Sequence, residues 1–307
     1  MKFTIYQESR IGKRKNNEDR IAHCYSREAL LMVVADGMGG HFYGEVAAQI
    51  AVQTLTEAFQ READPAIGDP FMFLQRAMMR AHHAIFDFSI QHNLSDSPRT
   101  TCVACIVQDN IAYWAHAGDS RLYLIREGKA FFRTRDHSRV QLLMDEGIIT
   151  QAQAARHPER NKVYSCLGGP QTPEIELSRK TPLNTADVLA LCSDGVWGPL
   201  SDEFLAQSLN SSTNLIEAIP LLLDKAETRG GLHADNLSIV AVRWEQSYAD
   251  EAANADSVVS TEGMSGDKIT TRLDKFGRNP DYKSDLTEDD IERAIEEIRS
   301  TIEKYTQ

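Results

Sequence analysis

Short apolar segments that adjoin an aspartate recur along this chain, and they constrain its fold more than any other feature. Asp36 ends the apolar run 30–35, and Asp194 closely follows the run 188–192. Asp119 follows a third run, whereas Asp235 stands just before a fourth. Because a folded sheet can bring the ends of distant strands together, we expect these side chains to gather at one edge. Clustered carboxylates need cations to offset their mutual repulsion.

With Glu18 and Asp19 near the start of the chain, six carboxylates fit this pattern. Their hard oxygen atoms suit Mg²⁺ or Mn²⁺, whereas zinc would call for cysteine or histidine partners. One carboxylate shared by two ions can hold them roughly 3.5–4 Å apart, with a bridging water acidic enough to attack a phosphate ester. Arg14, four residues before Glu18, is placed to grip phosphate oxygens through its planar guanidinium. Each aspartate alone is typical of a turn, but the set favours a binuclear metal site.

The order of the expected elements predicts a layered α+β fold with antiparallel sheet. Helical patterns occur at 43–61, 70–91 and 214–228, and Pro220 is expected to kink the third helix or delay its start. One strand and two helices precede a run of strands, so the elements do not alternate as in a parallel sheet. The expected strands are short, aliphatic or β-branched, and bounded by turn residues: 29–35, 101–108, 110–117, 120–126, 174–179, 186–192 and 236–244.

Three further segments have a different character. Residues 145–165 interrupt the strands and are interpreted as a surface flap beside the site. Residues 246–286 are poor in large apolar groups and predict a flexible acidic linker. Residues 287–307 begin like a capping box and carry an isoleucine stripe, which predicts an amphipathic helix. Since a helix of this length is marginal alone in water, we expect it to fold back on the rest of the chain or to bind a partner or a second copy.

The bulk properties exclude some classes of protein. A formal charge of −12 over 307 residues argues against a nucleic-acid surface, which needs clustered Lys and Arg. Five cysteines, several of them inside apolar runs, are typical of reduced core thiols in a cytoplasmic protein. No signal peptide and no apolar run near the roughly 20 residues of a membrane span is recognised.

Six motifs, in order, give the chain a resemblance to a known family. They are Arg14-x-x-x-Glu18-Asp19, the Asp-Gly-Met-Gly-Gly-His segment 36–41, Gly118-Asp119-Ser120-Arg121, Asp136-His137-Ser138, Ser193-Asp194-Gly195 and Asp235-Asn236. Over about residues 8–244, their order and approximate spacing resemble the metal-dependent, type 2C, Ser/Thr protein phosphatases. The Asp-Gly-Met-Gly-Gly form resembles the bacterial members. Any one motif alone would be a weak signal, whereas six in order are specific.

The resemblance implies a four-layer α-β-β-α sandwich, in which helices flank two antiparallel sheets, as the catalytic domain at 1–245. It implies two Mn²⁺ or Mg²⁺ ions, with a weaker third, and a hydroxide that bridges the metals and attacks phosphorus in line without a phosphoenzyme. Arg14 would bind phosphate and Asp19 would orient a metal-bound water. The implied ligands are Asp36, Asp194 and Asp235 for the first ion, Glu18, Asp36 and the Gly37 carbonyl for the second, and Asp119 with Asp194 for the third.

The expected function is therefore hydrolysis of phosphoserine and phosphothreonine in cytoplasmic proteins, in opposition to a Ser/Thr kinase. Met38 stands where animal relatives carry a histidine proposed as general acid, and a thioether cannot donate a proton. One alternative is a catalytically weak phosphoprotein-binding module recruited to a complex through 287–307, although the intact acidic ligands argue against it. Another is a small-molecule phosphatase, which shares the chemistry and which the residues do not exclude.

Overall fold

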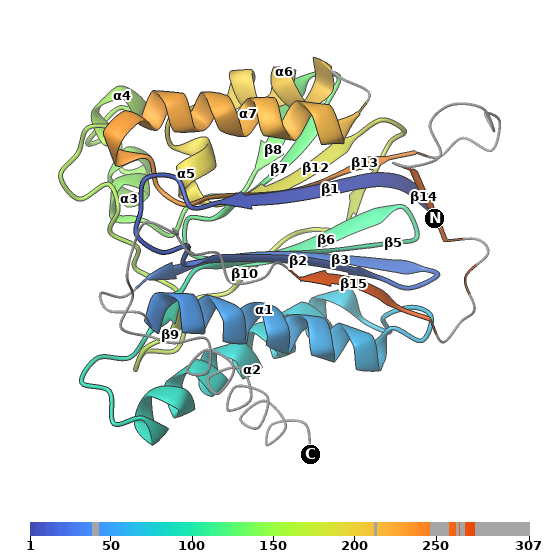
Figure 1. Ribbon diagram of the computed structural model, residues 1–307, viewed down its shortest axis with the longest axis horizontal. Coiled ribbons are helices and arrows are strands. Elements are labelled where there is room, and N and C mark those ends of the chain that lie inside the picture. The colour runs from blue at the N-terminus through green and yellow to red at the C-terminus, as the bar shows by residue number, and fades with distance from the viewer. Residues whose placement is uncertain (39–42, 212–213, 246–257, 262–263, 265–267, 274–307) are drawn as a thin grey trace.

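Two antiparallel sheets stack face to face, and helices cover the outer face of each (Figure 1). The structure is a computed structural model that describes residues 1–38, 43–211, 214–245, 258–261, 264 and 268–273. The upper six-stranded sheet of Figure 1 has the order β14 (Val258–Ser260), β1 (Lys2–Arg10), β13 (Leu237–Trp244), β12 (Val188–Cys192), β7 (Arg121–Arg126) and β8 (Lys129–Arg133).

The lower sheet has nine strands. Six form its main path, in the order β10 (Glu176–Leu177), β6 (Ile111–Ala117), β5 (Cys102–Gln108), β3 (Ala29–Met38), β2 (Asp19–Tyr25) and β15 (Thr270–Leu273). Three short strands complete it: β11 (Thr181–Pro182) pairs with β6, β4 (Arg99–Thr100) with β3, and β9 (Leu167–Gly168) with β4. This layered arrangement of two antiparallel sheets with flanking helices confirms the expected fold class.

The helices divide between the two outer faces. Beneath the nine-stranded sheet lie α1 (Tyr43–Glu62) and α2 (Pro70–Gln91) (Figure 1). Above the six-stranded sheet lie α5 (Asp194–Trp197), α6 (Asp202–Ser211) and α7 (Leu215–Gly230), followed by the 3₁₀ turn η1 (Gly231–His233). The short helices α3 (Arg139–Asp145) and α4 (Gln151–Ala154) lie at one end of the sandwich. No helix among these described residues is long and apolar enough to cross a membrane.

Strand β3 shows why two sheets and two helical layers form. Its side chains alternate between the faces of the sheet, as the period of a strand requires. Leu30, Met32 and Val34 join the core between the sheets, whereas Leu31 and Val33 join the core under α1 and α2. A strand that is apolar on both faces must be covered on both, and that requirement places β3 at the centre of the molecule.

Most expected elements occur close to their predicted bounds. Helix α2 spans 70–91 as predicted, because Asp69 caps it and Pro70 opens it. Of the two effects expected of Pro220, a kink or a delayed start of the third helix, the delay does not occur. That helix begins at Leu215, where the Asn214 side chain accepts a hydrogen bond from the Ile216 N–H, and it runs on through Pro220. The expected strand 174–179 is shorter than predicted, at Glu176–Leu177.

The segment 246–286 differs from a plain linker where the structure describes it. Strand β14 extends the upper sheet by pairing with β1, and β15 extends the lower sheet by pairing with β2. The sequence did not indicate these strands, because three or four residues paired at an edge need little apolar surface of their own. The helix expected at 287–307 lies outside the described residues.

Candidate metal and phosphate site

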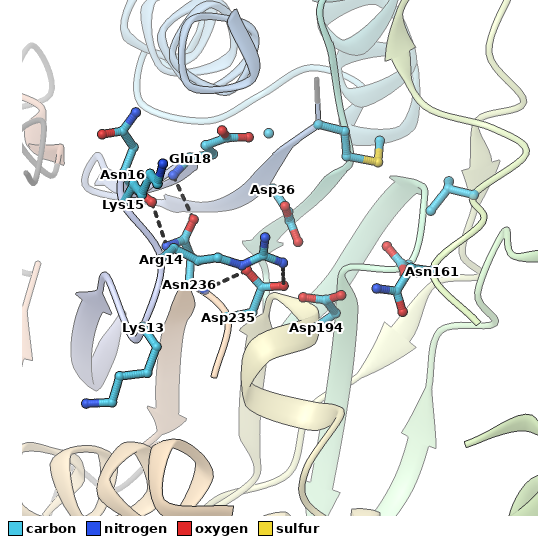
Figure 2. A pocket seen from close by; sticks show the side chains of 14 residues that line it. Lys13, Arg14, Lys15, Asn16, Glu18, Asp36, Asn161, Asp194, Asp235 and Asn236 are labelled. Carbon is cyan, nitrogen blue, oxygen red and sulfur yellow. Dashed lines mark hydrogen bonds and ion pairs between the residues drawn. The ribbon is translucent and has the colours of Figure 1, made fainter. Parts of the chain in front are cut away.

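A cavity of about 660 Å³ opens at one end of the sandwich, where segments from both sheets converge. Figure 2 shows the side chains of Asp36, Asp194 and Asp235 near one another in this cavity, with Arg14 reaching toward Asp235. The lining residues are Lys13, Arg14, Lys15, Asn16, Glu18, Asp36, Gly37, Met38, Asp119, Asn161, Val163, Asp194, Asp235 and Asn236. Every residue that the sequence predicted as a metal ligand or phosphate clamp is among them.

Strands β2 and β3 bring the first acidic residues together. Their register places Asp19 opposite Asp36, and the Gly37 N–H donates to the Glu18 carbonyl at 3.2 Å. A Cβ on Gly37 would lie 2.2 Å from the Gly44 carbonyl oxygen, so only glycine allows the start of α1 to approach this closely. A Cβ on Gly44 would in turn lie 2.5 Å from Glu18 Oε2. The two glycines therefore leave room for the Glu18 carboxylate beside the backbone of Gly37.

The neighbouring strands β12 and β13 supply the second pair. Asp194 begins α5 two residues after β12 ends, and Asp235 precedes β13 by two residues. A Cβ on Gly195 would lie 2.0 Å from the Asn236 carbonyl oxygen. This close contact between the two turns requires glycine after Asp194 and holds the Asp194 and Asp235 carboxylates on the same side of the cavity (Figure 2).

Asn236 holds the loop that carries Arg14 and Glu18, a role that the sequence analysis missed. Its Oδ1 accepts the Glu18 N–H at 2.8 Å, and its Nδ2 donates to the carbonyls of Ile11 and Asn16 at 2.9 Å each. One side chain thereby ties β13 to the loop between β1 and β2. The Asp235-Asn236 pair was visible in the sequence, but its partners lie more than 200 residues away and no local pattern indicates them.

Asp119 reaches the cavity from the turn after β6. Next to it, Arg121 donates two hydrogen bonds to Asp136, both 2.8 Å long, and its guanidinium stacks 3.5 Å from the Trp197 ring centroid. The Trp197 indole N–H donates to the Asp119 carbonyl at 3.0 Å. These contacts fix the backbone of the turn and leave the buried Asp119 carboxylate facing the cavity.

Asp19 lies behind the cavity wall and does not line it. Its Oδ2 accepts the Ser193 hydroxyl at 2.7 Å, and Ser193 Oγ in turn accepts the Ser238 N–H at 3.0 Å. The Oδ1 atom of Asp19 is buried and has no hydrogen-bond partner within the described part of the chain. A buried carboxylate oxygen without a partner is costly, so this atom marks a place where water or a cation belongs.

Burial and mutual repulsion raise the pKa values of the acidic side chains. Burial first, and then the charge of Glu45, raises the pKa of Glu18 to about 7. Burial and the charge of Asp235 raise the pKa of Asp194 to about 7, and burial raises that of Asp19 to about 6. The pKa values of Asp36 and Asp119 lie well above the ordinary range for the same two causes. Such a set of carboxylates favours the uptake of protons or of cations.

The donor set fits divalent cations of the hard kind. Carboxylate oxygens and the Gly37 carbonyl are the available donors, which suits Mg²⁺ or Mn²⁺. The basic side chains of the wall are partly open to solvent, since Lys13 is 52% and Arg14 56% exposed. Arg14 donates to Asp235 Oδ2 at 2.5 Å, so its guanidinium lies at the cavity, where it can also bind an anion.

The flap predicted at 145–165 lies beside the site. Asn161 and Val163 line the cavity, and Val163 pairs with Ser138 in an isolated antiparallel bridge. The Tyr164 N–H donates to the His137 carbonyl at 2.9 Å. The flap is therefore attached to the loop before α3 at the point where it reaches the cavity.

Comparison with known proteins agrees with this geometry. The family model described as "Protein phosphatase 2C" matches residues 6–232. A "Putative protein phosphatase 2C-type" of Streptococcus pyogenes is 31% identical over 76% of this chain and 94% of that protein. The "Serine/threonine phosphatase stp" of Listeria monocytogenes is 31% identical over 69% of this chain and 83% of its own.

Solved structures extend the comparison to the fold. The serine/threonine phosphatase of S. agalactiae superposes with a TM-score of 0.71 at 28% identity, covering 79% of this chain and all of that one. The catalytic domain of the serine/threonine phosphatase PstP, solved in complex with two manganese ions, superposes with a TM-score of 0.68 at 30% identity, covering 80% of this chain and all of that domain. This chain belongs to the protein phosphatase 2C family of metal-dependent Ser/Thr protein phosphatases.

Proposed function

We propose that this phosphatase acts with two divalent cations, Mn²⁺ or Mg²⁺, and opposes a Ser/Thr kinase by removing phosphate from phosphoserine and phosphothreonine. Asp36, Asp194 and Asp235 would hold one ion, and Glu18, Asp36 and the Gly37 carbonyl would hold the other. Asp119 with Asp194 would form a weaker third site. The observation that carries the proposal is the convergence of these acidic residues with Arg14 on one cavity. The two manganese ions in the PstP structure support the same count.

The bound cations would supply an acidified water and neutralise charge on the phosphoryl oxygens. The chain itself supplies positioning. Arg14, which now donates to Asp235, can present its planar guanidinium to two phosphate oxygens. Asp19 is held by Ser193 and offers its unpartnered Oδ1 to a water molecule. Met38 lines the cavity but cannot donate a proton to the leaving oxygen, so water or another group would have to supply that proton.

The shape of the cavity supports a protein substrate. It is open and edged by exposed side chains of the flap and of the loop 13–16, and such a rim can accommodate the residues beside a phosphorylated side chain. Localisation in the cytoplasm stays a prediction; the cysteines, which are free thiols and mostly buried, are consistent with it.

The test is hydrolysis of a phosphothreonine peptide by the full chain with Mn²⁺, with EDTA, and by the Asp36→Asn and Asp194→Asn variants. We expect activity that requires the metal and falls roughly 100-fold or more in both variants, because each loses a carboxylate that stabilises charge through the ions. Asp96→Asn, which removes an exposed carboxylate from a loop, is the matched control and should keep full activity.

Three outcomes would contradict the proposal. Activity that persists in EDTA would remove the metal requirement. Folded, metal-loaded protein that captures phosphopeptides without turnover would favour the alternative of a phosphoprotein-binding module. A value of kcat/KM much higher for p-nitrophenyl phosphate than for the peptide would instead indicate a small-molecule phosphatase.

A further inference from the structure

Two histidines and a glutamate form a second group of possible ligands outside the catalytic cavity. His116, His137 and Glu176 each offer one ligand atom, and these atoms all lie within 4.8 Å of one another. None of the three residues lines the cavity of the carboxylates. They come from β6, from the loop before α3 and from β10, so the fold brings together three segments that are distant in sequence.

The sheet places His116 and Glu176 together. Strands β6 and β10 are antiparallel, and their register sets Glu176 directly opposite His116. Directly opposed residues of an antiparallel pair have Cβ atoms roughly 4.5–5.5 Å apart on the same face. The ring of His137 lies against that of His116, with 4.5 Å between the centroids. His137 Nε2 is 3.5 Å from Glu176 Oε2.

The hydrogen bonding of His116 leaves one ring nitrogen with a free lone pair in the interior of the protein. Its Nε2 lies 2.7 Å from the Arg135 carbonyl oxygen, which can only accept, so this nitrogen carries the proton. Nδ1 is then an acceptor, and it is buried without a hydrogen-bond partner among the described residues. His116 as a whole is 1% exposed. A histidine whose one ring N–H donates to a backbone carbonyl, with the other nitrogen free, has the arrangement typical of a metal ligand.

His137 and Glu176 can adapt to an ion. The Gly118 N–H lies 3.4 Å from His137 Nδ1, a contact too long to fix which nitrogen is protonated. The Glu176 side chain is 50% exposed and can rotate. Metal bonds of roughly 2.0–2.2 Å require the ligand atoms to move inward from their present spacing, and the half-exposed Glu176 side chain can make that movement.

We infer that His116, His137 and Glu176 form a binding site for a zinc-like divalent transition-metal ion, distinct from the all-oxygen catalytic centre. Two imidazoles and one carboxylate suit Zn²⁺, Co²⁺ or Ni²⁺, whereas Mg²⁺ and Mn²⁺ prefer the carboxylate cluster. The three ligands leave a fourth position on the exposed side of Glu176 for water. An ion bound here would also restrain the flap, because Tyr164 stacks on the His137 ring at 5.4 Å and donates its N–H to the His137 carbonyl.

The test compares two charge-matched variants of the full chain, Glu176→Gln and Glu174→Gln, each in the Asp36→Asn background and with millimolar Mg²⁺ to occupy the remaining carboxylates. Glu174 is an exposed glutamate two residues away that takes no part in the group. Zn²⁺ binding is measured by calorimetry, and Co²⁺ binding by its visible absorption, which reports nitrogen ligands and coordination geometry.

We expect one equivalent of Zn²⁺ to bind the Glu174→Gln protein, and to bind about 10-fold or more weakly when Glu176 is replaced. The Co²⁺ absorption should follow the same difference. His116→Asn should abolish both signals, but because its side chain is buried that variant is informative only if its circular dichroism shows a folded protein. Equal zinc affinity and equal Co²⁺ spectra in Glu176→Gln and Glu174→Gln would overturn the inference. Activity is not needed as a readout, so failure of the proposed phosphatase mechanism would leave this result interpretable.

Discussion

At the scale of one residue, Asp36 shows that a carboxylate placed to bind a cation lowers the stability of the cation-free fold. Burial and the charges of Asp19 and Asp194 raise its pKa well above the ordinary value of an aspartate. A raised pKa means that the folded state favours the protonated form. The contribution of the protonated Asp36 side chain to the free energy of unfolding is therefore complete below the ordinary pKa. It is lost as the pH rises toward the pKa of the folded state. At pH 8, without a cation, the Asp36 carboxylate is therefore a destabilising group.

The variant Asp36→Asn should therefore be more stable than the wild type in EDTA at pH 8, while losing its activity. Asparagine keeps the shape of the side chain and has no charge to desolvate. With saturating Mn²⁺ the order should reverse, because the wild type binds the ion and gains stability by mass action. Urea denaturation under both conditions measures the difference, with Asp96→Asn as a surface control. A variant that is less stable in both conditions would show that Asp36 is held by favourable contacts of its own.

His23 makes a pH-dependent contribution far from the catalytic chemistry. Burial first, and then the nearby Arg272, lower its pKa from 6.5 to about 4. The ring Nδ1–H donates a hydrogen bond to Gln7 Oε1 at 2.7 Å, and the ring stacks on Tyr25. Between pH 6.5 and 4 the unfolded chain protonates His23 and the folded protein does not, so its contribution to stability falls as the pH falls.

Replacing this side chain by His23→Gln should remove that dependence. The difference in free energy of unfolding between the variant and the wild type should shift in favour of the variant by roughly 1–3 kcal/mol as the pH falls from 7 to 4. This shift does not depend on which of the two proteins is more stable at pH 7. Chemical denaturation at intervals of pH measures the trend. The exposed His83→Gln variant is the control, and a His23→Gln curve parallel to the wild type would contradict the prediction.

The same scale shows what the sequence could reveal of the site. Asp36, Asp194 and Asp235 could be predicted to lie together because each adjoins an apolar run, at a point where strand ends meet. The hydrogen-bonding roles of Asn236 and Ser193 could not be predicted, because their partners come near only in the folded chain. Asn236 bonds to the backbone of Glu18 and Asn16, and Ser193 bonds to the Asp19 carboxylate.

At the scale of elements, the predictions succeeded where local signals and burial agree. Helix α2 has both an apolar face and its capping residues, and its bounds were predicted correctly. Strands β1 and β2 were missed although β1 pairs with β13 over eight residues. Their polar side chains, such as Gln7 and Arg20, are buried through hydrogen bonds to distant partners, so the apolar pattern that marks a strand is absent from the sequence.

The flap is the element in which a change should affect substrate binding more than chemistry. Tyr164 stacks on His137 with an interplanar angle of 26°, and the neighbouring Val163 lines the cavity. We expect Tyr164→Ala to raise KM for a phosphopeptide several-fold and to leave kcat within about twofold, because the metal ligands are untouched. Hydrolysis of p-nitrophenyl phosphate, which carries no peptide residues for the flap to bind, should hardly change.

Tyr164→Phe, which keeps the ring, is the matched control and should behave like the wild type. A fall in kcat with unchanged KM in Tyr164→Ala would contradict this assignment, since it would mean that the stack supports the catalytic residues themselves.

At the scale of the whole molecule, the chain beyond the catalytic sandwich ties the two sheets together. Strand β14 extends the upper sheet and β15 the lower one, at the end away from the cavity (Figure 1). Between them Thr261 is fully buried. Its hydroxyl donates to the Arg27 carbonyl at 2.7 Å and accepts from the N-terminal ammonium group of Met1 at 2.8 Å. The boundary expected at residue 245 therefore does not mark the end of the packed structure.

Replacing Thr261 by valine tests whether this junction stabilises the sandwich. Valine keeps the shape of the side chain, but it leaves the Met1 ammonium group and the Arg27 carbonyl without their buried partner. The free energy of unfolding should fall by about 1–3 kcal/mol, whereas kcat and KM should not change, because the cavity lies at the opposite end of the sheets. Thr261→Ser retains the hydroxyl and should lose much less. If Thr261→Val is as stable as the wild type, the junction is a passive contact and the sandwich of residues 1–245 supports itself. If the variant instead loses activity, the two ends of the sandwich are coupled through the strands that connect them.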